Sequence, residues 1–272
     1  MKTPLSPQMR FSPMLLILSL SGALACPSAL HAQDSDVDEL IQWLLEDDRD
    51  LAGVPFSAVV KATAGKKIIP LEPAKTTDRE LLKKIEQAVG ATMALMNEPD
   101  GPAHKQRRIN EVSAHFEKAL RNALNEIPGF ECDYPKTASG RIQRSGYPDL
   151  RLVVESTGRV VYLDPKLFNQ SGRTSSFRTF YFTPKKETNK ILDDAHHLIV
   201  GFAHDGKHDG LWKFVGWEIV DLSRFKVRLK AEFQGSNRDL YQEETVVGTS
   251  ESAKKSGRKT KSPADFGLPG FG

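Results

Sequence analysis

Two apolar segments, each rich in β-branched residues, are the feature that most constrains how this chain folds. They cover residues 149–154 and 160–168, and Ser156-Thr157-Gly158 between them is typical of a turn. Strand-forming segments joined this closely pair with each other. The pattern therefore predicts a β-hairpin centred on residue 157.

The predicted hairpin brings charged side chains together at its open end. Pairing about residue 157 places Asp149 opposite Pro165. Side chains alternate between the two faces of a strand, so Asp164 and Lys166 point to the same face. We therefore expect two carboxylates and one ammonium to meet at one end of the hairpin.

This grouping is costly unless a cation offsets it, because neighbouring carboxylates repel and raise each other's pKa. A hard divalent ion is the natural choice, since Mg²⁺ takes oxygen ligands and binds through carboxylates plus substrate phosphates. Lys166 would then lie beside an attacking water. Phosphodiester hydrolysis uses such parts: a metal that generates hydroxide, and a cation that stabilises or positions the nucleophile.

The rest of the chain predicts a layered α/β or α+β domain in which helices flank a mixed sheet. Apolar residues at helical spacing predict long helices over 78–96 and 104–126 and a short acidic helix over 37–45. A strand pair is expected over 56–71, turning at Ala64-Gly65-Lys66. The remaining expected elements are strands over 177–183, 198–203 and 212–233, the last in two pieces, and a helix over 187–196.

Pro148-Asp149, followed after fourteen residues by Asp164-Pro165-Lys166, resembles the motif of the PD-(D/E)xK nuclease superfamily, which includes many restriction endonucleases. The resemblance covers about residues 105–205 and implies a restriction-endonuclease-like core. It implies that the two aspartates hold Mg²⁺, with Mn²⁺ as an alternative, and that the lysine positions or activates the water. It also implies a nucleic-acid substrate, DNA before RNA.

Members of this superfamily often add a glutamate from the helix before the hairpin. The predicted helix over 104–126 offers Glu111 and Glu117, on opposite flanks of its apolar face. The superfamily's spacing favours Glu117 as a further metal ligand and catalytic residue, and an ordinary solvated glutamate is the alternative for each. Pro165 departs from a regular strand because it cannot donate a ladder hydrogen bond, so it implies an edge, a bulge or a strand end.

Basic residues interleaved with aromatic ones surround the hairpin, as a groove that follows a phosphate backbone requires. A solvated basic face beside core aromatics is the alternative interpretation. The candidate nucleic-acid-binding residues are Arg144, Arg173, Arg178, Lys185 and Lys186, with loop 169–176 expected nearest to the substrate. The overall formal net charge is +3, but residues 51–250 alone carry 30 basic and 25 acidic side chains, a net charge of +5 that is compatible with a polyanionic partner.

The N-terminus has the layout of a secretory signal, in which basic residues precede an apolar stretch over 14–20 and a run of small residues. Cleavage is expected after Ala25 or Ala32, which predicts an exported protein, periplasmic or secreted. Cleavage after Ala25 would leave Cys26 at the new N-terminus, where a lipid anchor is an alternative to simple release. After this stretch the sequence contains no run of 18 or more apolar residues, so no later segment is expected to span a membrane.

These patterns divide the chain into successive parts. Residues 1–32 are the signal, 33–102 an N-terminal extension of helices and a hairpin, 103–250 the nuclease domain, and 251–272 a basic tail. The tail mixes Lys, Arg, Ser, Gly and Pro with few large apolar residues, so it is expected to be disordered.

The function predicted is an exported, metal-dependent nuclease. Low sequence specificity is expected rather than site-specific restriction, because the methylase that accompanies a restriction enzyme would not be expected outside the cytoplasm. Two other functions compete with it. A catalytically silent nucleic-acid-binding module would keep the same fold and basic groove. A zinc-dependent hydrolase would use the histidines between His196 and His208, although their spacing fits no zinc template closely and a turn between strands explains 204–210 more simply.

Overall fold

The computed structural model describes residues 34–46, 52–176, 180–230, 232, 234–242 and 244–248. The chain divides into two units, Met1–Asp47 and Asp48–Gly272. Helix α1 (Asp34–Glu46) belongs to the first and confirms the helix predicted over 37–45. The predicted signal, the tail over 251–272 and Arg178 lie outside the described residues. No helix in the described part of the chain combines the length and apolar content that a membrane crossing requires.

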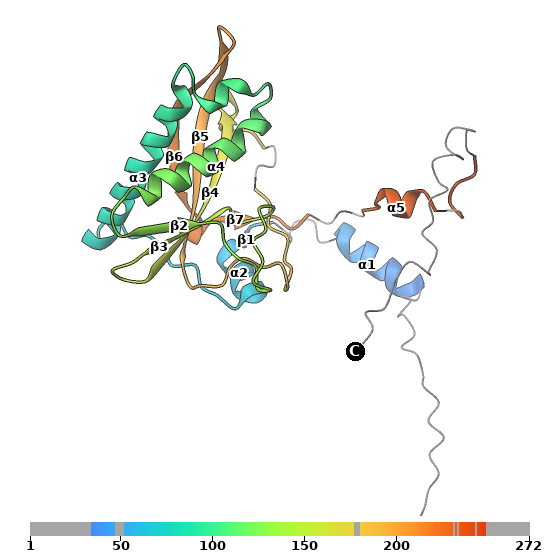
Figure 1. The fold of residues 1–272 in the computed structure, drawn as a ribbon. Helices are drawn as coiled ribbons and strands as arrows, with labels where there is room; N and C mark the ends of the chain where they lie inside the picture. Colours follow the sequence, from blue (N-terminus) through green and yellow to red (C-terminus); the bar gives the residue numbers. More distant parts are fainter. Residues whose placement is uncertain are drawn as a thin grey trace, which may run out of the picture. The chain divides into compact units, whose positions relative to one another are not determined.

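A five-stranded mixed sheet forms the centre of the second unit, in the order β2-β3-β4-β5-β6 (Figure 1). Its strands are β2 (Phe130–Asp133), β3 (Leu150–Val154), β4 (Arg159–Asn169), β5 (His196–His208) and β6 (Leu211–Asp221). Strands β4 and β5 run parallel and every other neighbouring pair is antiparallel. The predicted layered domain with a mixed sheet, consistent with a restriction-endonuclease-like core, is therefore confirmed.

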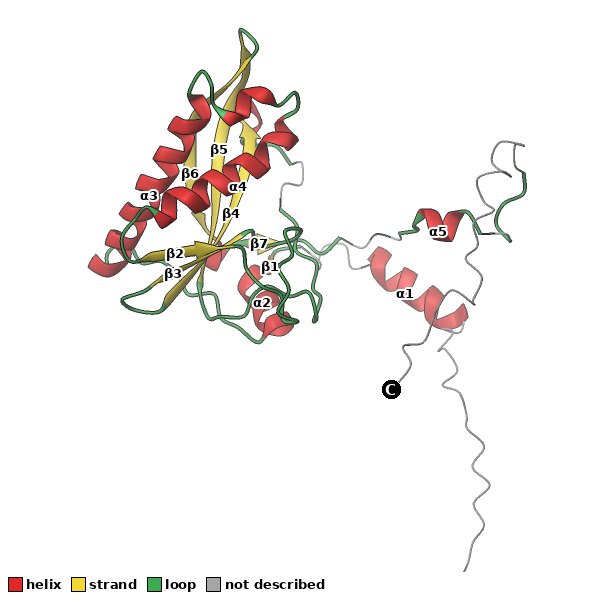
Figure 2. Ribbon diagram, viewed as in Figure 1, coloured by secondary structure: helices red, strands yellow, loops and turns green. Residues whose placement is uncertain are grey.

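Two long helices, α3 (Thr76–Asn97) and α4 (Ile109–Asn125), cover one face of the sheet (Figure 2). Their apolar stripes and the inner residues of the strands form the larger core, in which the fully buried Phe116 of α4 packs on Phe202 and Phe214. Both helices were predicted. The second begins at Ile109 rather than 104 because Pro102–Lys105 forms a separate 3-10 helix, η1.

The strand pair predicted over 56–71 is wrong. Residues Phe56–Ala64 form helix α2, which ends at the left-handed Gly65. Phe56 and Val60 lie one helical turn apart and are both fully buried, so this short apolar run fits a helix face as well as a strand. Helix α2 contributes to the smaller core cluster, beside the short strands β1 (Val54–Pro55) and β7 (Lys226–Val227), which pair with each other.

Two further predicted elements are wrong. Residues 180–183 form no strand, and the helix expected over 187–196 is an irregular connector that leads into β5. The side chain of Asn189 satisfies the hydrogen-bonding capacity of two backbone groups in this connector, since it accepts from Ile191 N and donates to Ile191 O. Asparagine side chains that replace backbone partners in this way compete with helix formation. The short remaining helix α5 (Asn237–Leu240) and the 3-10 helices η2 (Gln170–Gly172) and η3 (Leu222–Arg224) complete the described elements.

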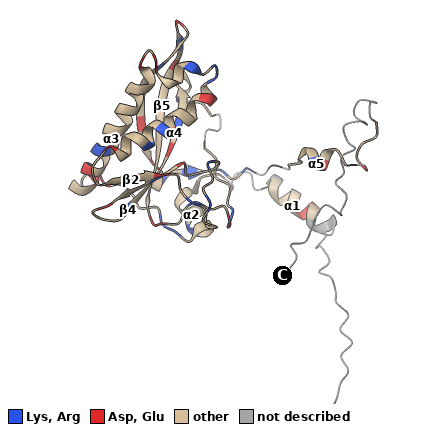
Figure 3. Cartoon of the chain, viewed as in Figure 1, with Lys and Arg blue, Asp and Glu red and all other residues tan. Residues whose placement is uncertain are grey.

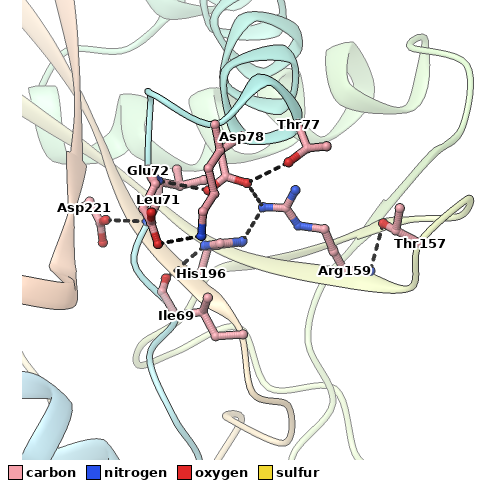
Figure 4. Close-up of polar contacts among 10 residues, drawn as sticks. Ile69, Leu71, Glu72, Thr77, Asp78, Thr157, Arg159, His196 and Asp221 are labelled. Atoms are coloured by element: carbon pink, nitrogen blue, oxygen red, sulfur yellow. Dashed lines mark hydrogen bonds and ion pairs between the residues drawn. The ribbon is translucent and has the colours of Figure 1, made fainter.

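A polar cluster ties the start of α3 to the starts of β4 and β5 (Figure 4). Arg159 Nη2 lies 2.7 Å from both Asp78 Oδ1 and His196 Nε2. Because the guanidinium can only donate, His196 accepts at Nε2 and donates from Nδ1 to the carbonyl of Ile69 at 2.9 Å. The second Asp78 oxygen accepts from the backbone of Glu72. The cluster therefore locks segments that lie far apart in the sequence.

Candidate active site

The β3–β4 register differs by one residue from the predicted one. The turn covers 155–158, and Leu150 pairs with Leu163, so the ladder continued by one residue places Asp149 opposite Asp164, not Pro165. The prediction assumed an odd number of turn residues centred on Thr157. Directly opposed residues share one face of a sheet, which brings the two carboxylates closer together than the predicted register did.

Strand β4 loses its partner on one side where the charged residues begin. Its pairing with β3 stops at Leu163, whereas its pairing with β5 continues from Val161 to Asn169. Pro165 therefore lies in a stretch with an open edge, where its missing N–H is tolerated. The edge predicted from Pro165 is confirmed, and it leaves β4 without a paired strand on the β3 side beyond Leu163.

Lys166 links the two carboxylates. Its Nζ lies 2.5 Å from Asp164 Oδ2 and 3.8 Å from Asp149 Oδ2. The Asp164 side chain is 2% exposed, and its Oδ2 forms this ion pair without hydrogen-bond geometry to any described residue. The structure thus brings together the three residues of the predicted motif, with a buried oxygen that retains its acceptor capacity.

The two aspartates share their environment electrostatically. Burial raises the pKa of Asp149, the charge of Asp164 raises it further, and Lys166 lowers it. A hydrogen bond between the two carboxyls also favours the protonated form of Asp149. Two carboxyls arranged in this way retain a proton, or take up a cation in its place, more readily than isolated aspartates do.

Glu117 and Glu111 occupy different environments on α4. The side chain of Glu117 is 17% exposed and accepts from Arg144 Nη2 at 2.7 Å, and its charge acts on Asp149. Glu111 instead accepts from the backbone N–H of Arg108 at 3.2 Å and caps the start of the helix. Of the two, Glu117 therefore lies on the side of the carboxylate pair.

This difference predicts that the same substitution affects activity at one position and only stability at the other. If the metal-dependent cleavage expected from the sequence takes place at this site, Glu117→Gln should lower it at least about tenfold, as loss of a group supporting a metal site does. Glu111→Gln should leave cleavage unchanged and cost about 0.5–1 kcal/mol of stability through the weakened cap. Cleavage rates and urea unfolding of both variants check this, and equal activity of the two would contradict the assignment of Glu117.

The candidate nucleic-acid-binding residues are spread around this edge. Arg144 stacks on Tyr134 with its guanidinium carbon 4.9 Å from the ring centre. Arg173 pairs with Glu218 at 2.8 Å and lines, with Lys166, a cavity of about 410 Å³. Lys185 and Lys186 are exposed, and Arg178 lies outside the described residues. Figure 3 shows that residues of both charge signs lie on α3 and α4, so the basic side chains do not form one uniform face there.

The histidines of the alternative zinc site are engaged elsewhere. His197 Nδ1 lies 2.7 Å from Tyr147 Oη, His204 Nδ1 accepts from Gly206 N, and His208 faces Asp205 at 3.3 Å. Within the described residues, no group of three or more His, Cys, Asp or Glu side chains could hold a metal ion. A histidine zinc site is therefore not formed in this part of the chain.

Divalent-metal chemistry fits the aspartate pair better. Mg²⁺ commonly binds through one or two carboxylates and completes its shell with water and substrate phosphates, so a full set of three protein ligands is not required. Asp149 and Asp164 supply hard oxygen donors, and Asp164 Oδ2 has acceptor capacity that the described residues leave unused by hydrogen bonds. These two residues would hold the ion, with Glu117 as a further candidate.

His197 and Tyr147 form a buried pair near the two aspartates that the sequence did not predict. His197 is fully buried, stacks on the Tyr147 ring at 5.9 Å, and lies two residues before β5 residue Ile199, the partner of Asp164. Burial lowers the pKa of His197 to about 3. His196 and His197 are both buried, and nothing in the sequence indicates which of the two contacts Tyr147.

The lowered pKa of His197 predicts a loss of stability in acid. Histidine in the unfolded chain has a pKa near 6.5. As the pH falls below that value, His197 becomes protonated in the unfolded chain but stays neutral in the folded protein, which favours unfolding. Between pH 7.5 and pH 5 this group should cost about 1–2 kcal/mol of unfolding free energy. Urea titrations of wild type and His197→Phe isolate the effect, because the other groups cancel in the difference. An identical pH dependence in both proteins would contradict it.

Comparison with known proteins gives two matches. The chain matches the Type II restriction enzyme MjaV family over residues 50–244. It is also 32% identical, over 222 residues, to the Type II restriction enzyme MjaV of Methanocaldococcus jannaschii, an alignment that covers 78% of this chain and 94% of that protein. The matched range of the family includes the hairpin, α4 and the open edge of β4.

Proposed function

The chain belongs to the Type II restriction enzyme MjaV family, and from that premise we propose that it is a metal-dependent nuclease that hydrolyses phosphodiester bonds of DNA. The observation that carries the proposal is the grouping of Asp149, Asp164 and Lys166 at the open edge of β4. We assign this site to the PD-(D/E)xK kind. Its order along the chain and its position at a strand edge both support that assignment.

Each residue has a role that follows from its charge and place. Asp149 and Asp164 would hold Mg²⁺ or Mn²⁺, which when bound neutralises phosphate charge and makes hydroxide available near neutral pH. Lys166 Nζ, already beside both carboxylates, would orient the attacking water and stabilise negative charge that develops on the phosphate. Glu117 would support the two aspartates from α4 through its charge, and Arg144, Arg173, Lys185 and Lys186 would contact the phosphate backbone, with Arg178 in the same role.

Incubation of supercoiled plasmid with the purified protein tests the proposal. We expect cleavage with Mg²⁺ or Mn²⁺ and none with EDTA, and cleavage should return when metal is restored. DNA binding without cleavage, over several plasmids and metals, would instead indicate the silent binding module. Linear double-stranded DNA, single-stranded DNA and RNA in the same assay identify the substrate class.

Low sequence specificity is part of the proposal and has its own readout. It rests on the predicted export, because a host methylase would not protect DNA outside the cytoplasm. A nuclease of low specificity degrades plasmid to a smear, whereas a site-specific enzyme yields discrete fragments of constant size. Discrete fragments would overturn the low specificity and leave the nuclease assignment intact.

We further propose that the protein is exported after cleavage of its N-terminal segment. The support is the basic, apolar and small-residue pattern of residues 1–32. Expression of the full chain in a bacterial host should yield a product beginning at Cys26 or Gln33 in the periplasm or the medium. Mass spectrometry of the N-terminal peptide checks this, and an added lipid mass on Cys26 would identify an anchor. A full-length cytoplasmic product would contradict export.

A further inference from the structure

Lys190 is a buried ammonium that lies outside the motif. It is 2% exposed, although lysine is rarely buried so fully without partners. Its Nζ donates to the carbonyl oxygen of Gly146 and, at 3.3 Å, to that of Gln143. The residue comes from the irregular connector before β5, so it joins two connectors that are distant in the sequence.

The two carbonyls belong to the connector that leads into β3. Gly146 has φ +82°, a left-handed conformation, and lies three residues before Asp149. A second tie between the two connectors is the hydrogen bond from Ala138 N to Asn189 O at 2.8 Å, which lies farther from Asp149 along the chain. The path of the chain from Gly146 to Leu150 decides where the Asp149 carboxylate points, so the anchor on Gly146 bears directly on that carboxylate.

The charge of Lys190 is also directed at the site. Burial lowers the pKa of its ammonium, and the negative charges of Asp149, Asp164 and Glu117 act against that effect. All three candidate carboxylates therefore lie within electrostatic reach of a second buried cation, in addition to Lys166. An ammonium in this position has two possible effects, because it either repels a bound metal or fixes the ligands that hold it.

We propose that Lys190 is a positioning residue of the metal site, whose hydrogen bonds to Gln143 and Gly146 hold the connector that presents Asp149 to the cation. The inference rests on the proposed nuclease function. The loss of the Lys190 charge and the loss of its hydrogen bonds should change the affinity for a divalent cation in opposite directions. Removal of a nearby positive charge alone would tighten the binding of a divalent cation, whereas release of the connector would weaken it.

Direct Mn²⁺ binding, measured by calorimetry on the full chain without DNA, separates these effects. Lys190→Met keeps the apolar stem and removes the donors, and should weaken Mn²⁺ binding about tenfold to a hundredfold, as loss of outer-shell support does. Lys190→Arg, which keeps donors and charge, should recover part of that loss. In plasmid cleavage at saturating Mn²⁺, Lys190→Met should lower kcat and leave KM for DNA within about twofold.

Two controls exclude a merely structural effect. Lys83→Met makes the same chemical change at an exposed position of α3, and Ile85→Ala destabilises the core on the same helix, which carries none of the candidate ligands. Both should bind Mn²⁺ as wild type does. If Lys190→Met does not fold, Lys190→Gln provides the same comparison, with the same expected weakening.

The outcomes separate the two proposals. Wild-type protein that binds Mn²⁺ and cleaves DNA, beside a folded Lys190 variant with equal or tighter Mn²⁺ binding, overturns the positioning role and leaves the nuclease intact. Wild-type protein that neither binds Mn²⁺ nor cleaves overturns both. Weaker binding in Lys190→Met with recovery in Lys190→Arg supports the positioning role.

Discussion

Asp164→Asn should lower the rate of metal-dependent DNA cleavage by at least about a thousandfold, which corresponds to a loss of ~4 kcal/mol of transition-state stabilisation. Asp164 is the most buried member of the carboxylate pair, and its Oδ2 lies 2.5 Å from Lys166 Nζ. The substitution keeps the shape of the side chain but removes the charge that would hold the metal and orient the lysine. Initial rates on supercoiled plasmid over a range of Mg²⁺ concentrations measure the effect.

The loss of activity should occur without loss of the fold. A neutral amide in place of the Asp164 carboxylate removes the ion pair with Lys166 but also relieves repulsion with Asp149, which stays beside that lysine, so the metal-free variant is expected to remain folded and to unfold cooperatively in urea. Asp209→Asn is a suitable control, because Asp209 is exposed at the tip of the β5–β6 hairpin and its φ of 52° is one that asparagine tolerates. Asp164→Asn activity within tenfold of wild type at saturating Mg²⁺ would refute the proposed site.

The sequence was informative where one physical pattern dominated. The apolar period of α4 predicted a buried stripe, and Val112, Phe116, Leu120 and Leu124 form it. The hairpin was predictable because a turn between two β-branched segments leaves few alternatives. Since a period of two determines the face of each side chain, the association of Asp164 with Lys166 followed without knowledge of the remaining fold.

Other features depend on contacts that no local pattern encodes. The segment over 56–64 has apolar residues that fit either a strand or a helix, and burial of Phe56 against Phe180, Phe182 and Phe225 favours the helix. The register depended on a single turn residue. The sequence does not separate Glu111 from Glu117, because the contact that distinguishes them is an ion pair between Glu117 and Arg144, which comes from a connector farther along the chain.

Lys190 and His197 illustrate the same limit at the site itself. Both residues look like ordinary polar positions in the sequence, and both are buried by elements that meet only in three dimensions. Lys190 contacts a connector 44 residues earlier and His197 contacts Tyr147, 50 residues earlier. The motif specifies only residues within the hairpin. It therefore does not indicate which distant residues hold those side chains in place.

Phe116→Ala should cost about 3–5 kcal/mol of unfolding free energy, the range for truncation of a fully buried phenylalanine. The Phe116 ring is fully buried, with ring centres 4.4 Å from Phe202 of β5 and 4.7 Å from Phe214 of β6. Alanine would leave a cavity between α4 and the sheet, and Glu117 is the next residue on that helix. Urea unfolding at constant m-value measures the cost, with the more exposed Leu95→Ala of α3 as the control, expected to change stability by less than about 1 kcal/mol. A Phe116→Ala cost as small as that of the control would show that α4 is not held on the sheet by this contact, and the docking that brings Glu117 toward Asp149 would need another cause.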